Sequence, residues 1–151
     1  MSIELGDAAA TEALAARLAT AIPANGESCM ILLQGELGAG KSTLARAMLR
    51  KLGHDGPVPS PTYTLVEPYE IAGRSIYHID LYRIAGLEEL EYLGWQDLQG
   101  GLLLIEWPER APELNNIADL RIALTYEGQG RRASIEGLSE QGRVIAAAVL
   151  S

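Results

Sequence analysis

The sequence has almost no cysteine. Cys29 is the only thiol among 151 residues, so the chain cannot form an internal disulfide. Its place within an apolar segment predicts a small buried side chain without a catalytic role. Internal repeats and low-complexity tracts are also absent. A chain of this length holds one sizeable core but not two, so we expect residues 1–151 to form a single domain that folds unaided.

Basic residues are scarce as well. The chain carries 12 Lys and Arg against 20 Asp and Glu, which gives a formal net charge of −8. A protein that binds nucleic acid by itself neutralises phosphates with clustered Lys and Arg, and this composition does not supply such an excess. We therefore expect any contact with nucleic acid to be made through a partner.

The start of the sequence lacks the features of a targeting segment. Residues 1–5 have no basic side chain of the kind that begins a secretory signal, and Glu12 and Arg17 interrupt the alanine-rich run that follows. We expect neither a signal peptide nor a membrane span, and therefore a cytoplasmic protein without a membrane partner.

The most specific motif in the chain is a glycine-rich phosphate-binding pattern, G-x-x-x-x-G-K-[ST], at residues 35–42. Its glycines allow successive backbone N–H groups to face one concavity at the N-terminus of the next helix, which predicts the binding of a nucleoside triphosphate. Lys41 is expected to contact the β- and γ-phosphates, and the Ser42 hydroxyl to ligate Mg²⁺. The predicted nucleotide-binding residues are Glu36, Leu37, Gly38, Ala39, Gly40, Lys41, Ser42 and Thr43.

The segments on either side of this pattern are the ones that a phosphate-binding loop requires. Residues 28–34 contain a continuous apolar run, which is typical of a strand covered on both faces. Residues 41–52 have apolar side chains at helical spacing before Gly53, which predicts a helix. Strand, glycine loop and helix therefore follow one another in the required order.

The rest of the chain alternates between helix and strand patterns. A first helix is expected between Asp7, its N-cap, and Pro23 and Gly26, which end it. Further helices are expected at residues 86–93 and after Ser139, and further strands at residues 63–71, 75–81, 102–106, 120–126 and 132–138, with a hairpin at 72–74. The predicted fold is an α/β, P-loop NTPase-like three-layer sandwich with a mixed, largely parallel central sheet.

Two acidic residues lie at the ends of apolar strands. Asp80 is near the end of residues 75–81, where the active sites of open α/β sheets gather. Glu106 ends the continuous apolar run 102–106, the form of a buried parallel strand whose last carboxylate reaches Mg²⁺ or its attacking water. His78 shares a strand face with Asp80, but a lone strand histidine is more often packed or hydrogen-bonded than catalytic, so we interpret it as structural.

Three features leave alternatives open. Residues 53–62, with three prolines and two glycines, are equally consistent with a segment that senses the γ-phosphate and with a plain connection. If the strand continues past Glu106, Trp107 points to its opposite side as a core or rim aromatic. Its position beside Glu106 also allows the alternative that it braces the switch loop or a partner. The acidic helix at 86–93 is interpreted as a solvated face rather than a docking surface.

Two further absences narrow the class of nucleotide-binding protein. The chain has no Asn-Lys-x-Asp motif, which guanine-specific switches usually carry, so ATP is expected rather than GTP. It also has no evident Arg-rich lid of the kind that small-molecule phosphotransferases of this superfamily usually need.

Four blocks of the sequence, taken in order, resemble the signature blocks of the TsaE family, the ATPase subunit of bacterial tRNA threonylcarbamoyladenosine synthesis. The resemblance covers nearly the whole chain and is weakest in the first helix and after Pro108. Ser42 is a departure, because family members often have Thr there, but either hydroxyl can ligate Mg²⁺. The blocks are GELGAGKST at 35–43, SPTYTLV at 60–66, HIDLYR at 78–83 and EWP at 106–108.

The resemblance implies a P-loop fold in which residues 60–66 act as a switch. It implies that Asp80 and Glu106 complete the site, so that Lys41, Asp80 and Glu106 are catalytic and Ser42, Asp80 and Glu106 hold Mg²⁺. The implied partner is the TsaB–TsaD pair, which transfers a threonylcarbamoyl group to tRNA and which ATP hydrolysis resets between turnovers; tRNA is met only indirectly. The alternatives are a nucleotide-dependent binding module with incidental hydrolysis and a small-molecule kinase.

Overall fold

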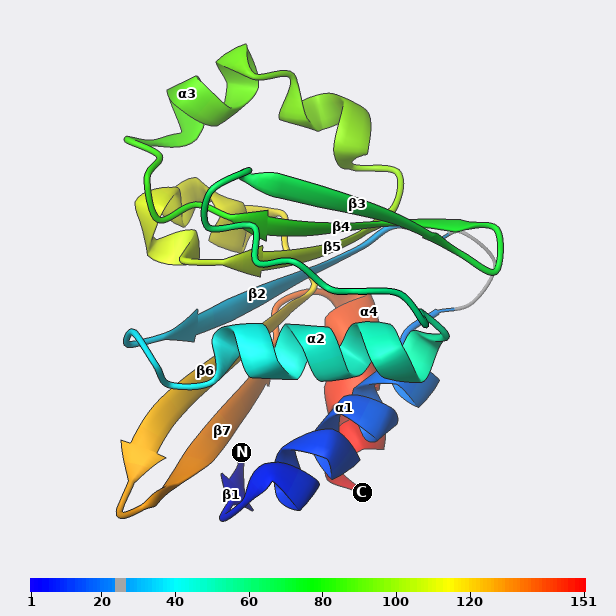
Figure 1. The fold of residues 1–151 in the computed structure, drawn as a ribbon, viewed down its shortest axis with the longest axis vertical. Coiled ribbons are helices and arrows are strands. Elements are labelled where there is room, and N and C mark those ends of the chain that lie inside the picture. Colours follow the sequence, from blue (N-terminus) through cyan, green and yellow to red (C-terminus); the bar gives the residue numbers. More distant parts are fainter. Residues whose placement is uncertain (24–26) are drawn as a thin grey trace.

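The computed structural model describes residues 1–23 and 27–151. They form a seven-stranded sheet between two layers of helices (Figure 1). The strands are β1 (Ser2–Leu5), β2 (Cys29–Gly35), β3 (Val66–Ile71), β4 (Arg74–Asp80), β5 (Leu102–Glu106), β6 (Leu120–Glu127) and β7 (Gly130–Gly137). The helices are α1 (Ala8–Ala21), α2 (Lys41–Leu52), α3 (Leu87–Tyr92) and α4 (Glu140–Leu150), with short 3-10 turns η1 (Trp95–Leu98), η2 (Pro108–Arg110) and η3 (Pro112–Asn116).

The sheet is parallel at its centre and antiparallel at its edges. The strand order is β1-β7-β6-β2-β5-β4-β3. The central strands β6, β2, β5 and β4 pair in parallel, whereas β1 with β7, β7 with β6 and β4 with β3 pair antiparallel. The predicted α/β fold with a mixed, largely parallel sheet is therefore confirmed.

Apolar side chains fill the space on both faces of the sheet. Strands β2 and β5 contribute to both faces, which is why their sequences are continuously apolar rather than alternating. One face is covered by α1, α2 and α4, and its core includes Leu14, Leu18, Ile31, Leu44, Met48, Leu104 and Ile145. The other is covered by α3 and the 3-10 turns, and its core includes Leu32, Ile79, Leu90, Trp95, Ile105 and Leu114.

The register of the parallel strands sets the place of the candidate site. Leu33 of β2 and Asp80 of β4 both lie opposite Glu106 of β5, so β4 and β5 end at one level and β2 continues past it to Gly35. The chain leaves β2 at Gly35 and enters the glycine loop at that edge. The carboxyl ends of the strands therefore bring together segments that are far apart in the sequence.

Most predicted elements have the expected positions. The predicted helix 41–52 and strand 102–106 have the observed bounds, and Ala72 and Gly73 form the predicted hairpin turn with positive φ. The strand expected from residue 63 begins at Val66, because the preceding residues form a turn and Leu65 has a φ of 73°. Strand β1 was not predicted, since only its pairing with β7 defines these four residues.

The first helix begins at its predicted N-cap, where the Asp7 carboxylate accepts a hydrogen bond from the backbone N–H of Ala10. It ends at Ala21, and Gly26, which was expected to help end it, lies outside the described residues. In α3 the glutamates are exposed and Leu90 is buried, as expected of a helix with one solvated face. No helix in the described ranges is long and apolar enough to cross a membrane.

Cys29 is the small buried residue that the sequence predicted. Its exposed fraction is 1%, and burial, assisted by the negative charge of Asp119, raises the pKa of the thiol to about 12. A thiol that stays protonated and inaccessible is a poor nucleophile, so its position is explained by packing alone.

Gly142 provides a test of how α4 is packed. It lies in the first helical turn, and a Cβ there would be 1.5 Å from the carbonyl oxygen of Asp119, which already accepts a hydrogen bond from Leu138. Gly142→Ala should therefore lower the free energy of unfolding by about 1–3 kcal/mol through overpacking, although alanine is normally the better helix residue. Urea unfolding followed by circular dichroism measures this.

The matched control is Ala147→Gly on the exposed face of the same helix, where loss of helix propensity should cost about 1 kcal/mol. A Gly142→Ala variant more stable than the wild type would contradict this packing.

Candidate active site

A cavity of about 170 Å³ opens at the carboxyl ends of β2, β4 and β5. It is bounded by the glycine loop and the start of α2 on one side and by strand-end carboxylates on the other. Among the described residues, the buried Lys, His, Asp and Glu side chains are Lys41, His78, Asp80 and Glu106, and all four belong to this region. The lining residues are Leu37, Gly38, Gly40, Lys41, Ser42, Thr43, Thr62, Asp80, Glu106 and Trp107.

The glycine loop needs glycine where it meets strand β6. At Gly35 a Cβ would lie 2.6 Å from the carbonyl oxygen of Leu124, and at Gly38, where φ is +80°, it would lie 2.7 Å from the Tyr126 hydroxyl. The loop ends at Gly40, the N-cap of α2, which offers no side-chain cap. The first N–H groups of a twelve-residue helix are therefore left without a side-chain acceptor beside the cavity.

Two side chains of the β6–β7 hairpin hold the outer side of this loop. The Tyr126 hydroxyl donates to the carbonyl of Leu37 at 3.0 Å, and Arg131 donates to the carbonyl of Gly38 at 3.3 Å. The two residues lie opposite each other in the hairpin, with the guanidinium 4.2 Å from the tyrosine ring centroid. The sequence pattern placed Tyr126 in a strand but gave no signal for this contact.

Lys41 is turned back into the loop. Its exposed fraction is 5%, and its ammonium group donates to the carbonyls of Gly35 and, at 3.1 Å, of Glu36. The same group lies 3.9 Å from the centroid of the Trp107 ring. Burial lowers the pKa of Lys41, and the nearby carboxylates of Glu106, Glu109 and Asp80 oppose that shift. The site thus holds a cation whose partners are neutral carbonyls and a ring face.

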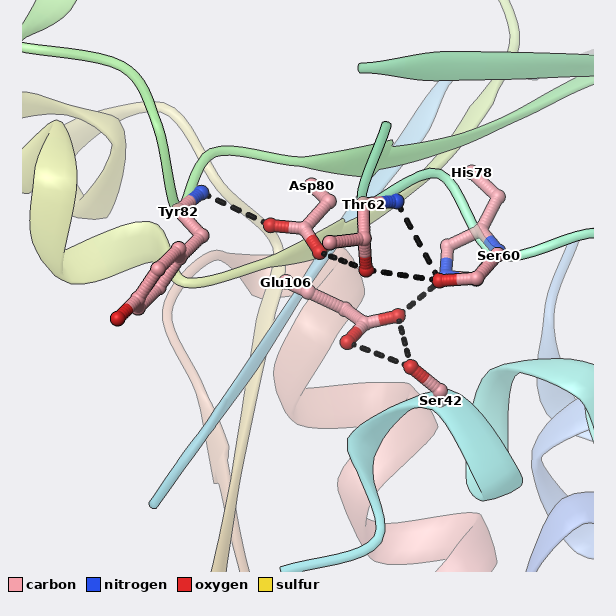
Figure 2. A network of polar contacts seen from close by, with 7 residues as sticks. All are labelled: Ser42, Ser60, Thr62, His78, Asp80, Tyr82 and Glu106. Atoms are coloured by element: carbon pink, nitrogen blue, oxygen red, sulfur yellow. Dashed lines mark hydrogen bonds and ion pairs between the residues drawn. The ribbon is translucent and has the colours of Figure 1, made fainter. Parts of the chain in front are cut away.

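Glu106 is held between α2 and β4 (Figure 2). Both of its carboxylate oxygens lie 2.9 Å from the Ser42 hydroxyl, and one lies 2.5 Å from Nε2 of His78. Its exposed fraction is only 2%, and that of His78 is 1%. The predicted hydrogen-bonded role of His78 is correct, but its partner is a candidate catalytic residue.

Asp80 connects the site to the 53–62 loop. One carboxylate oxygen accepts from the backbone N–H of Tyr82 at 2.8 Å, and the other accepts from the Thr62 hydroxyl at 3.1 Å (Figure 2). The hydroxyls of Thr62 and Ser60 are themselves 2.8 Å apart. The loop therefore reaches the strand-end carboxylate of Asp80, and its movement with nucleotide state stays a prediction.

Comparison with known proteins decides the family. The family model described as "Threonylcarbamoyl adenosine biosynthesis protein TsaE" matches residues 5–134, which is most of the chain. The chain belongs to the TsaE family. Its members act in tRNA threonylcarbamoyladenosine biosynthesis, as the resemblance of the four sequence blocks predicted.

Relatives and a solved structure agree with this assignment. The tRNA threonylcarbamoyladenosine biosynthesis protein TsaE of Haemophilus influenzae is 44% identical over 124 residues, covering 81% of this chain and 78% of that protein. The TsaE of Synechocystis sp. is 42% identical over 120 residues, covering 76% and 74%. The crystal structure of Bacillus subtilis YdiB has a TM-score of 0.78, at 20% identity, over 99% of this chain and 93% of that one, and so shares the fold.

In this TsaE-family chain the predicted site residues gather at one cavity, with two exceptions. Ala39 is buried in the core beneath the loop, and Glu36 contributes its carbonyl to Lys41 rather than a lining side chain. In the described part of the chain no three His, Cys, Asp or Glu side chains form a metal site. A metal here would be held by a hydroxyl and two carboxylates, from Ser42, Asp80 and Glu106.

Trp107 does not continue its strand. Strand β5 ends at Glu106, and Trp107 has a φ of 57°. The strand therefore does not continue, and its alternation does not set the direction of the Trp107 side chain. Its ring contacts Lys41 and lies 4.9 Å from the Tyr82 ring, between centroids. The tryptophan therefore borders the cavity instead of filling only the core.

The contact between the hairpin and the glycine loop can be tested by stability measurements. Gly38→Ala should cost about 1–2 kcal/mol for the positive φ and more for the clash with Tyr126. Combining it with Tyr126→Phe removes the clashing oxygen, so the double variant should be at least about 0.5 kcal/mol more stable than additivity allows. Chemical unfolding of the four proteins measures the coupling.

Gly73→Ala is the matched control. Gly73 has a φ of +78° with nothing near its missing Cβ, so it carries the backbone strain without a clash. The Gly73→Ala variant should lose less stability than Gly38→Ala, and its loss should add to that of Tyr126→Phe. Equal costs at the two glycines would mean that the loop and hairpin are not in contact.

Proposed function

We propose that this protein is a Mg²⁺-dependent ATPase that supports tRNA threonylcarbamoyladenosine formation by binding and resetting the TsaB–TsaD pair. The observation that carries the proposal is the convergence of one cation, one hydroxyl and two carboxylates on a cavity beneath a glycine loop, in a chain of the TsaE family. Tight phosphate binding and water activation need these groups in one place.

The glycine loop supplies the phosphate-binding groups. Its outer carbonyls at Leu37 and Gly38 are tied to the hairpin, and the uncapped start of α2 presents backbone N–H groups and the positive end of the helix dipole to the cavity. Lys41 adds a full charge. When a triphosphate enters, the ammonium group exchanges its two carbonyl acceptors for phosphate oxygens, which are stronger partners for a cation.

The residues present fit a magnesium ion. Mg²⁺ is usually held by one or two carboxylates together with phosphate oxygens and water, and Ser42, Asp80 and Glu106 offer a hydroxyl and two carboxylates at the end of the glycine loop. When bound, the ion would neutralise charge on the β- and γ-phosphates.

Glu106 is the residue proposed to orient the attacking water. Phosphoryl transfer to water depends on positioning and charge stabilisation more than on covalent chemistry. The carboxylate is buried and held by two hydrogen-bonding groups at the level where β5 ends. A fixed carboxylate at this place can accept a hydrogen bond from a water molecule. That hydrogen bond would direct the lone pair of the water oxygen at the γ-phosphate.

The proposal is tested by single-turnover hydrolysis of ATP by this chain, alone and with purified TsaB–TsaD, with released phosphate as the product. We expect slow hydrolysis alone and faster hydrolysis with the pair, and no tRNA modification in cells that carry only the Lys41→Ala variant. Binding of ATP without hydrolysis in either condition would favour a nucleotide-dependent binding module. Phosphate transferred to a small acceptor would favour a kinase.

Glu106→Gln separates hydrolysis from binding. The amide keeps the shape of the side chain but is a weaker acceptor, so the rate of hydrolysis should fall about 100-fold or more while ATP affinity changes little. Calorimetric titration and single-turnover kinetics give the two quantities.

The control is Glu113→Gln, which changes an exposed carboxylate in η3. This variant should keep both the rate of hydrolysis and the affinity for ATP. A Glu106→Gln variant that loses Mg²⁺-dependent affinity in step with its rate would instead make Glu106 chiefly a metal ligand.

A further inference from the structure

His78 is a buried polar residue whose place is not explained by packing. It lies in β4 on the sheet face that α2 covers, in an apolar layer with Ile76 and Leu104, and its exposed fraction is 1%. In the described part of the chain, Nδ1 of its ring has no hydrogen-bond partner. Burying an unpaired ring nitrogen costs free energy that an apolar side chain would not, so the ring is retained for its other nitrogen.

That other nitrogen is directed at Glu106. Nε2 lies 2.5 Å from one carboxylate oxygen, which is a short hydrogen-bonding distance between two buried groups (Figure 2). Strand β4 fixes the position of the histidine, because its neighbours on both sides are paired in register with β3 and β5. The ring therefore reaches Glu106 from a rigid element, whereas β5 ends at Glu106 itself.

The second partner of Glu106 is itself part of the predicted nucleotide site. Ser42 has one hydroxyl proton to share between the two carboxylate oxygens, and its oxygen is also the predicted metal ligand, so the direction of this hydrogen bond is set anew when nucleotide and metal enter. Glutamate has three side-chain torsions, so one hydrogen bond leaves its carboxylate free to turn. His78 lies outside the predicted ligand set and holds Glu106 from the sheet.

We propose that His78 is a positioning residue that keeps the Glu106 carboxylate aimed at the cavity when Ser42 takes up its predicted metal-binding position. This inference rests on the proposed ATPase function, because it concerns the residue that orients the attacking water. It assigns to His78 an effect on turnover and little effect on nucleotide binding, since His78 is not itself a lining residue and reaches the cavity only through Glu106.

Kinetic comparison of His78→Leu and His78→Gln tests the inference. Leucine removes the donor, and we expect the single-turnover rate to fall about 10- to 100-fold, as misplacement of a reacting group does, with ATP affinity within about twofold of the wild type. Glutamine retains an N–H near the position of Nε2 and should recover much of the rate. Glu113→Gln, a change in an exposed residue of η3, is the control and should leave rate and affinity unchanged.

A spectroscopic measurement tests the contact without hydrolysis. The chain has two histidines, so His54→Gln assigns the ring signals of His78 in a ¹H–¹⁵N spectrum. The Nε2 proton of His78 should resonate downfield and exchange slowly, and it should move upfield in Glu106→Gln, whereas His54 should not respond. Thermal melting of each variant shows whether it remains folded.

The outcomes separate the two proposals. A wild-type rate in both His78 variants, or equal losses of rate and affinity in folded His78→Leu, would overturn the positioning role while leaving the ATPase assignment intact. If the signal of the His78 Nε2 proton does not shift in Glu106→Gln, the positioning role is also overturned. No hydrolysis by the wild-type chain, with or without TsaB–TsaD, would instead overturn the proposed function.

Discussion

The parallel register of β2, β5 and β4 is the constraint on which the site depends. Because Leu33 and Asp80 both lie opposite Glu106, β4 and β5 end at one level and β2 leads past it into the glycine loop, so the loop, two carboxylates and the 53–62 loop meet at this edge. A shift of one residue would turn Glu106 from the α2 face toward the other face of the sheet and away from Ser42. Strands β2 and β5 place apolar side chains on both faces, so their apolar residues alone would tolerate such a shift. The polar residues at the strand ends are what make it costly.

The site concentrates polar groups that the core elsewhere excludes. Lys41, His78, Asp80 and Glu106 are the buried Lys, His, Asp and Glu side chains of the described ranges, and each is held by at least one hydrogen bond. Desolvating these groups costs free energy that their mutual contacts offset only in part. Such an arrangement is expected where a protein keeps charges ready for a ligand, and it explains why Lys41 rests on neutral carbonyls and a tryptophan ring.

Local patterns in the sequence were sufficient for much of this description. The glycine pattern, the apolar strands and the acids that end them predicted the loop, the helix α2 and the convergence of Lys41, Ser42, Asp80 and Glu106. Contacts made by single side chains across the sheet were not predictable in this way. His78 reaches Glu106 over 28 residues and Tyr126 reaches Leu37 over 89, and neither leaves a periodic signal. The sequence left the place of Trp107 open, because a left-handed backbone conformation ends β5 without a glycine or proline at that position.

The most direct test of the central claim is a crystal structure of the chain with Mg²⁺ and a non-hydrolysable ATP analogue. We expect the triphosphate to lie along the glycine loop, with the ion about 2.1 Å from the Ser42 hydroxyl oxygen. We also expect the Lys41 ammonium group to have left the carbonyls of Gly35 and Glu36 for a phosphate oxygen. A nucleotide bound elsewhere, or a Lys41 that keeps both carbonyl contacts beside a bound triphosphate, would contradict the proposed site.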